Sequence, residues 1–91
     1  MFKDPETTAI ITTARIMNRM EPILSVWHDE EDGMWQFLGE SGPDESDAVI
    51  VGLQEIVKLD HSVNEVATLP LGWVAWREKK GLPWNIQKQL G

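Results

Sequence analysis

A histidine and four carboxylates are adjacent in the segment HDEEDGMW, residues 28–35, so side chains that bind metal ions or transfer protons occur together there. The spacing argues against a metal site. Neighbouring residues of a strand point to opposite faces, and a calcium loop places its acids at alternate positions. We therefore interpret this segment as the solvated tip of a hairpin, with no metal and no cofactor. Its carboxylates are Asp29, Glu30, Glu31 and Asp32.

A second carboxylate–imidazole pair occurs at Asp60 and His61. A general base needs a nucleophile or a substrate site beside it. The chain has no cysteine, and none of its serines lies in a nucleophile-elbow motif. We therefore predict that the protein is not an enzyme and has no catalytic residues. A small metal-binding or hydrolytic domain that uses His28 or His61 with nearby carboxylates is the least favoured alternative.

The segments PILSVWHD and MWQFLGE flank a turn containing Gly33, and both are rich in branched and aromatic residues, which is typical of a β-hairpin. With an even number of loop residues, even positions of the first strand share a face with odd positions of the second. One face then carries Leu24, Val26, His28, Trp35 and Phe37. The other carries Ile23, Ser25, Trp27, Met34, Gln36 and Leu38.

The other elements follow from residue type and spacing. The β-branched run TTAIITT favours a strand over about 8–16, although Asp4 and Pro5 resemble a helix start, so residues 4–16 stay open between strand and helix. Residues 47–52 fit either a short strand or the beginning of a helix. We predict a helix ending near Asp60, a short helix over 63–68 with a Ser62–Glu65 capping box, and a strand over 73–78.

These elements predict an α+β fold, with an antiparallel sheet of about four strands and one main helix and a short second helix on one face. The chain, 1–91, is interpreted as a single domain, with a compact core over 7–84 and a tail over 85–91. Trp84 is expected to dock on the core. The helix-free sheet face would carry Ile23, Trp27 and Leu38.

Charge is unevenly distributed in this chain of net charge −7. Between Arg19 and Lys58 there are ten acids and no lysine or arginine, while the remaining five acids and eight basic residues sum to +3. An acidic middle segment disfavours binding to nucleic acid or to an anionic membrane, because phosphate contacts need cations. It permits a basic protein partner, and a solubilising surface is the simpler alternative.

Five tryptophans occur in 91 residues, and the core is expected to take two or three of them. In WVAW, Trp73 and Ala75 face one way and Val74 and Trp76 face the other. A tryptophan beside an arginine is typical of interface hot spots. The candidate partner-binding residues are therefore Trp27, Trp76 and Arg77, together with Asp29, Glu30, Glu31 and Asp32.

Cellular location is indicated by what the chain lacks. Without cysteine it has no disulfide or thiolate chemistry, which fits a reducing compartment. Asp4 and Glu6 stand where a signal peptide needs a basic and then an apolar run, and no apolar stretch is long enough for a membrane span. We predict a cytoplasmic protein.

Several motifs together resemble a group of small bacterial proteins of unknown function that is similar to the immunity-protein-like domains found beside polymorphic toxins. The resemblance covers about residues 8–84 and rests on turn and packing positions. These are Asp32, Gly33, Trp35, Phe37, Leu53, Glu55, Ile56, Asp60, Ser62, Leu69, Pro70, Gly72, Ala75 and Arg77. The group often has proline at the position of His61, and it supplies no catalytic residues. The resemblance implies a domain that neutralises a protein partner by occluding it.

The expected function is therefore that of a non-enzymatic protein-binding domain, of immunity type, that uses an acidic and tryptophan-containing surface. The first alternative is a structural module that forms a homodimer through the helix-free sheet face. That alternative follows from the apolar residues expected on the face, because exposed apolar patches promote association.

Overall fold

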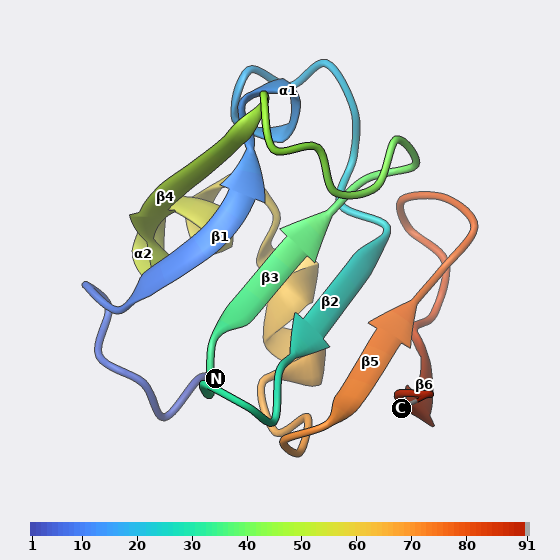
Figure 1. Cartoon of the computed structure of the whole chain (residues 1–91). Helices are drawn as coiled ribbons and strands as arrows, with labels where there is room; N and C mark the ends of the chain where they lie inside the picture. Colours follow the sequence, from blue (N-terminus) through green and yellow to red (C-terminus); the bar gives the residue numbers. More distant parts are fainter. Residues whose placement is uncertain (91) are drawn as a thin grey trace.

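A six-stranded mixed sheet forms the body of the protein in the computed structural model, which describes residues 1–90 (Figure 1). The fold is α+β, and the strand order is β4-β1-β3-β2-β5-β6. The strands are β1 (Ala9–Thr13), β2 (Ser25–His28), β3 (Trp35–Leu38), β4 (Ala48–Gly52), β5 (Trp73–Trp76) and β6 (Asn85–Lys88). The expectation of about four antiparallel strands is therefore only roughly right.

The N-terminal segment that was open between strand and helix contains both. Its β-branched residues form β1, and the chain then enters the short helix α1 (Ala14–Met17). Thr13 starts this helix, because its hydroxyl accepts a hydrogen bond from the amide of Ile16 at 3.2 Å. The strand expected to continue to about residue 16 therefore ends three residues earlier.

The hairpin of β2 and β3 has the register derived from an even loop. Val26 lies opposite Phe37 and His28 opposite Trp35, while Trp27 lies opposite Gln36. Val26 and Phe37 are fully buried, so this is the face that packs against the core. The predicted division of the two faces is confirmed for all residues of the two strands.

Strand β1 pairs in parallel with β3 and antiparallel with β4, which makes the sheet mixed. After β1 the chain turns through α1, descends along β2 and returns along β3, so β1 and β3 run in the same direction (Figure 1). Hydrophobic alternation assigns residues to the two faces of a sheet, but it does not determine which strands lie side by side. For this reason the parallel β1–β3 pair was not predicted.

Strand β4 resolves the segment 47–52, which fitted either a strand or a helix start. It pairs along its whole length with β1, from Ala48 opposite Thr13 to Gly52 opposite Ala9. Helix α2 (Leu53–Leu59) follows directly and ends at Leu59, next to Asp60, where its end was expected. Leu53 and Ile56 are the buried residues of this helix, and its other side faces solvent.

The second helix is a 3₁₀ helix, η1 (His61–Val66), and it begins earlier than the expected 63–68. Asp60 caps it, since its carboxylate accepts from the backbone amide of Ser62 at 2.9 Å. The Ser62–Glu65 capping box is therefore wrong. The residue two positions earlier performs the capping, and Ser62 instead donates its hydroxyl to Asp60 at 2.7 Å.

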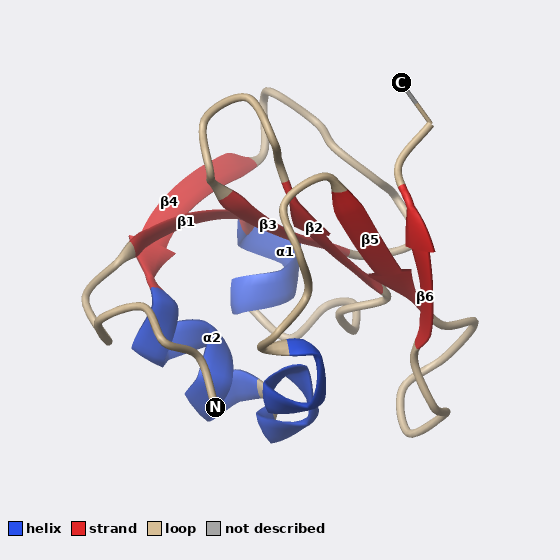
Figure 2. Ribbon diagram, turned by 90° about the horizontal axis from the view of Figure 1, so that it is seen from below, coloured by secondary structure: helices blue, strands red, loops and turns tan. Residues whose placement is uncertain are grey.

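The hydrophobic core lies between one face of the sheet and the layer of helices (Figure 2). Its buried members come from the helices, from strands β1, β2, β3 and β5, and from the connections between them. They are Ile10, Ile16, Ile23, Val26, Trp35, Phe37, Leu53, Ile56, Val63, Val66, Leu69 and Ala75. Phe2 packs edge-on against Trp35, with ring centroids 4.9 Å apart, so the core also includes a residue before the expected range 7–84.

The C-terminal segment is part of the sheet, which corrects the expectation of a tail over 85–91. Residues 85–88 form β6 and pair with β5, which itself ends at Trp76 rather than near residue 78. Residue 91 lies outside the described residues. The docking of Trp84 is confirmed: its indole donates to the carbonyl of Ser62 at 3.1 Å, and its ring centroid lies 3.9 Å from the Arg77 guanidinium carbon.

The helices are all short, and α2 with seven residues is the longest α-helix of residues 1–90. Within that range, no helix has the length and apolar character needed to cross a bilayer.

We expect Trp84→Ala to lower the free energy of unfolding by about 2 kcal/mol, because a half-buried ring, a cation–π contact and a hydrogen bond are lost together. Urea unfolding followed by circular dichroism measures this change. Leu82→Ala is the matched control, since Leu82 lies in the same segment and is 39% exposed. Equal effects of the two substitutions would show that Trp84 does not anchor the segment.

Candidate functional site

The carboxylates at the β2–β3 turn extend into solvent, as expected for a hairpin tip. Glu30, Glu31 and Asp32 are exposed, and Asp29 is half-buried. The turn is closed by backbone hydrogen bonds from Gly33 to Asp29 and from Asp29 to Met34, both 2.9 Å. Within residues 1–90, no three histidine or acidic side chains are grouped so that they could hold a metal ion.

The hairpin tip borders an open hollow on the helix-free side of the molecule. Residues 29–32 line one side, and Gly72 with residues 88–90 line the other. The Glu30 carboxylate lies against Gly72, where φ is +83° and a Cβ would come within 3.3 Å of Glu30 Oε2. Lys88 brings a single cation to this acidic hollow.

His28 is held in place by the fold. Its Nδ1 lies 2.7 Å from the carbonyl of Leu69, which can only accept, so Nδ1 carries the proton. Its ring stacks on Trp35 at a centroid distance of 3.8 Å and an interplanar angle of 10°. Trp35 is buried and its Nε1 has no partner among residues 1–90, so ring packing alone fixes it. These contacts assign His28 a packing role.

Two tryptophans lie on the helix-free face of the sheet. Trp27 on β2 is opposite Val74, and Ser25 is opposite Trp76, so the two indoles occupy diagonal positions of neighbouring strands. Each indole nitrogen is already bonded: Trp27 Nε1 donates to Ser25 Oγ at 2.9 Å and Trp76 Nε1 to Gln87 Oε1 at 3.1 Å. The rings are therefore held in defined orientations, and Trp76 is 39% exposed.

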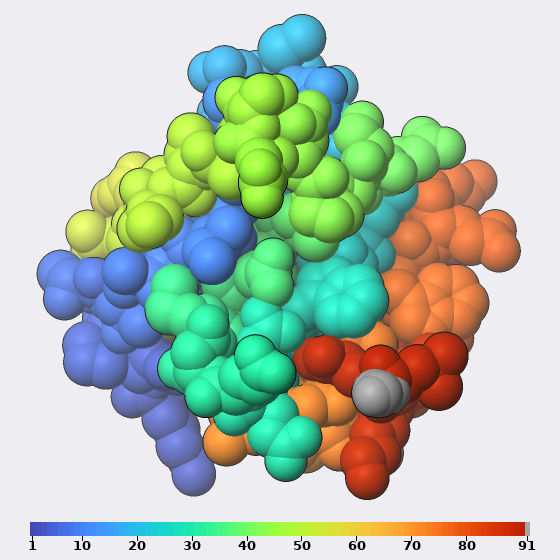
Figure 3. All heavy atoms as spheres, in the orientation of Figure 1, coloured from blue at the N-terminus to red at the C-terminus, as the bar shows by residue number. Residues whose placement is uncertain are grey.

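The register shows which side chains share this face, which Figure 3 views from the front. One row crosses all six strands at the level of Trp27. It contains Ile50, Ile11, Gln36, Trp27, Val74 and Gln87. We call Trp27, Gln36 and Trp76 the tryptophan face, since Val74, which lies in the same row, is only 5% exposed.

Acidic residues lie at both ends of the tryptophan face. Asp29 continues the alternation of Ser25 and Trp27, and its carboxylate accepts a hydrogen bond from Gln36. The hairpin tip therefore adjoins one end of the face. The β3–β4 loop, residues 39–47, lies at the opposite end of the sheet and carries four more acids (Figure 1).

Ile23 and Leu38 do not contribute an exposed patch to this face. Ile23 precedes β2 and belongs to the buried core, with 1% of its surface exposed. Side chains alternate between the two faces only within β2, which begins at Ser25, so the expected alternation over residues 23–28 does not apply to Ile23. Leu38 is on the helix-free side but is 5% exposed. Of the three expected residues, only Trp27 remains on the open face.

Arg77 is buried, so its expected place at a partner surface is corrected. Its side chain is 1% exposed, and its Nη2 lies 2.7 Å from Asp60 Oδ2. The guanidinium also donates to the Ile23 carbonyl, from Nε at 3.2 Å and from Nη2 at 2.9 Å. Nη1 donates to Ser62 Oγ at 2.9 Å. Arg77 therefore links the end of β5 to Ile23 before β2 and to Asp60 and Ser62 at the start of η1.

The Asp60 carboxylate is the centre of this buried polar network. Burial raises its pKa, but hydrogen bonds from the hydroxyl and amide of Ser62 and the ion pair with Arg77 outweigh burial and leave the pKa below its ordinary value. Asp60 therefore stays ionised and accepts bonds. A general base must be free to take a proton, and this carboxylate is fully engaged.

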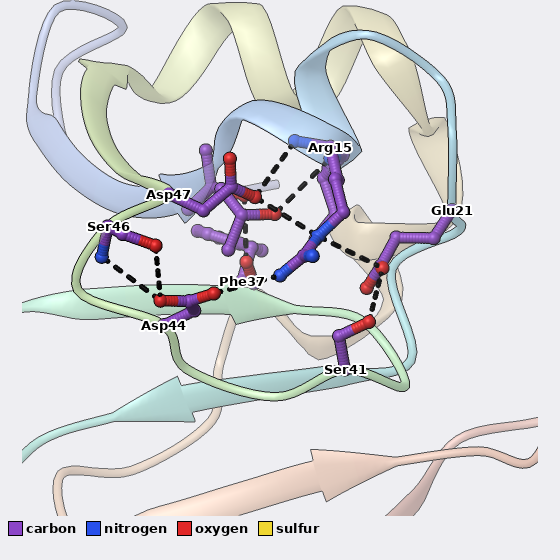
Figure 4. A network of polar contacts seen from close by, with 10 residues as sticks. Arg15, Glu21, Phe37, Ser41, Asp44, Ser46 and Asp47 are labelled. Carbon is purple, nitrogen blue, oxygen red and sulfur yellow. Dashed lines mark hydrogen bonds and ion pairs between the residues drawn. The ribbon is translucent and has the colours of Figure 1, made fainter.

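A second polar cluster fixes the start of β4, and Figure 4 shows it. Arg15 Nε lies 3.1 Å from Asp47 Oδ2 and 3.7 Å from Glu21 Oε2, and its Nη2 lies 3.4 Å from Asp44 Oδ2. Hydrogen bonds from Ser46, together with Arg15, lower the pKa of Asp44. One cation thus gathers three of the ten acids of the middle segment.

The structure therefore separates the residues that were grouped as a candidate binding surface. Trp27, Trp76 and the carboxylates of residues 29–32 lie on or beside one face, whereas Arg77 lies inside. The clusters around Asp60 and Arg15 were not predicted. Asp60, Ser62 and Arg77 all appear among the motif positions of the sequence, but nothing in their spacing indicates that they meet.

Comparisons with protein-family models, with curated proteins and with solved structures gave no match. The resemblance to immunity-protein-like domains thus stays an expectation from the sequence, and the functional argument depends on the geometry described above.

We expect Asp60→Asn to lower the free energy of unfolding by about 3 kcal/mol at pH 7, because it leaves the buried Arg77 charge uncompensated. Since the folded pKa of Asp60 is lowered, its contribution is complete above the unfolded value of about 3.9 and is lost as the pH falls through the folded value. Urea unfolding between pH 7 and pH 2 measures both effects.

Asp44→Asn is the control for that measurement. Asp44 also has a lowered pKa but lies at the surface, so its substitution should change stability little. If Asp60→Asn kept the stability and the acid sensitivity of the unmodified protein, the ion pair would not be a determinant of the fold.

We expect the melting temperature to stay unchanged when Zn²⁺, Ca²⁺, Mg²⁺ or Mn²⁺ is added. The hairpin carboxylates extend into water, and a metal that favours the native state would raise the melting temperature. Differential scanning calorimetry with and without a chelator measures this. A rise abolished by His28→Ala, or by Asp32→Asn, would place a metal site at the hairpin.

Proposed function

We propose that the protein is a non-enzymatic binding domain that recognises a basic protein partner through the tryptophan face and the adjoining carboxylates. The observation that carries the proposal is the position of Trp27 and Trp76 on a sheet face that no helix of residues 1–90 covers, next to the acidic hairpin tip. An immunity-type action, in which the domain occludes a functional surface of its partner, is consistent with this arrangement.

The tryptophan face supplies rigid aromatic contacts. The indole nitrogens of Trp27 and Trp76 donate to Ser25 and Gln87, so the rings lose little freedom when a partner packs on them. Tryptophan is enriched among residues that dominate binding energy, particularly where polar groups surround it. Gln36 and Gln87 supply that polar surround.

The carboxylates supply the charge preference. Glu30, Glu31 and Asp32 are exposed and pair with no cation among residues 1–90. Carboxylates at the rim of an interface accelerate association with a basic protein and orient it, and salt weakens this effect. A basic partner is therefore favoured over an acidic or neutral one.

The contacts of His28 and of Asp60 also favour a binding function over catalysis. His28 is stacked on Trp35 and bonded to Leu69, and Asp60 is ion-paired with Arg77. Asp60, the carboxylate of the Asp60–His61 pair seen in the sequence, is therefore engaged in an ion pair, whereas His61 is exposed.

The test is affinity capture from extracts of the source cell at low salt, followed by calorimetry with the recovered protein. We expect a basic partner whose affinity falls at least tenfold with Trp27→Ala plus Trp76→Ala, since such residues contribute on the order of 1–2 kcal/mol each. Ile86→Ala is the matched control, because Ile86 is 52% exposed and lies opposite Ala75 on the other sheet face.

Charge reversal separates the two parts of the proposed surface. Glu30→Lys with Glu31→Lys should weaken binding and reduce its dependence on salt. Absence of any partner at low salt would contradict the proposal. A partner that is insensitive to both the tryptophan and the charge substitutions would contradict it as well.

A further inference from the structure

Strand β4 is an edge strand without the features that normally protect sheet edges. Its sequence, AVIVG, contains no charge and no proline, and its pairing with β1 is regular, without a bulge. Ile50 is 69% exposed. Protected edges usually carry lysine, proline, a bulge or a covering segment, and an apolar edge that lacks these tends to pair with another strand.

The hydrogen-bond pattern shows which backbone groups point away from the sheet. Ala14 N donates to Asp47 O at 2.9 Å and Leu53 N to Thr8 O at 2.8 Å, so residues 47 and 53 face β1. Because the pattern alternates in an antiparallel pair, residues 49 and 51 also face β1. The amides and carbonyls of Ala48 and Ile50, and the amide of Gly52, therefore point outward.

The space beside this edge is open. Helix α2 follows β4 but lies behind the sheet, and the N-terminal segment lies on the β1 side (Figures 1 and 2). The opposite edge is different: β6 includes Lys88, a charged residue of the kind that protects edges. Only one of the two sheet edges is therefore both apolar and unprotected.

We propose that β4 pairs antiparallel with β4 of a second copy of this chain, across a twofold axis at Ile50, so that the two sheets become continuous. Ile50 would exchange both of its outward groups with Ile50 of the second copy, and Gly52 N would donate to the Ala48 carbonyl. The outward groups are centred on Ile50, so the strand complements itself without a shift in register.

Side chains are compatible with this pairing on both faces. The exposed Ile50 side chains would meet on the helix-free face. Val49 and Val51, which are half-buried, would lie opposite each other on the face toward the helices. Burial of apolar side chains beside a new ladder of hydrogen bonds is the usual source of affinity in strand addition.

The charges at the ends of β4 are largely compensated within each chain. Arg15 pairs with Asp44 and Asp47 before the strand, and Lys58 lies 3.6 Å from Glu55 after it. A second copy therefore meets few unpaired carboxylates, although the net charge of −7 still opposes association at low salt. Added salt should screen that repulsion and strengthen the dimer.

Sedimentation velocity of the whole chain tests the proposal. A five-residue strand pair makes a small interface, so we expect a dimer populated at roughly 0.1–1 mM and favoured by added salt. Ile50→Lys should raise the dissociation constant at least tenfold. Ile86→Lys is the matched control, since it places the same charge on the other edge strand and should leave the constant unchanged.

Amide hydrogen exchange gives a second readout that does not depend on a substitution. The amides of Ala48 and Ile50 should become protected as concentration rises, while the outward amide of Ile86 should not. A strict monomer at about 1 mM, or a dimer that survives Ile50→Lys, would overturn the proposal. The partner proposed for the tryptophan face is not involved, and that complex should respond to salt in the opposite direction.

Discussion

The buried ion pair of Arg77 and Asp60 is the interaction on which the arrangement of the fold depends. Arg77 follows β5, its guanidinium binds the Ile23 carbonyl before β2, and Asp60 stands between α2 and η1. Trp84 covers the guanidinium and binds Ser62, which attaches the approach to β6. A charge without partners is very costly in the interior, so these segments are held in one relative position.

That network also explains why the helices stay on one side of the sheet. Asp60 and Ser62 are bonded to Arg77. This places α2 and η1 so that their buried residues pack on the sheet face that carries Val26 and Phe37. Few helical residues remain to cover the opposite face. The position of Trp27 and Trp76 on one face and the open edge at β4 therefore have a common origin in the placement of the helices.

Local patterns predicted the local structure well. An even turn determined which hairpin residues share a face, and the spacing of Leu53 and Ile56 located α2. Such patterns do not predict pairing between strands that are far apart in the sequence, because the alternation of a strand is the same whichever strand lies next to it. The parallel β1–β3 pair and the addition of β6 were missed for that reason.

The error at Arg77 has a different cause. The alternation that turns Trp76 outward also turns Arg77 inward with Trp73 and Ala75, so the pattern itself indicated burial. A tryptophan beside an arginine has the composition of an interface hot spot, but adjacent residues of a strand point to opposite faces, so only Trp76 is exposed. Ile23 shows the reverse error, in which alternation was extended beyond the end of the strand.

The position of β1 has a consequence for how the chain acquires its structure during synthesis. Both neighbours of this early strand are encoded later, β3 at residues 35–38 and β4 at residues 48–52. During synthesis, the run of Ile10 and Ile11 therefore has no sheet partner until about 25 further residues have been added, and it has both partners only after about 40, a delay of a few seconds at ordinary elongation rates. Such an apolar segment is the part of a nascent polypeptide that a chaperone would bind first.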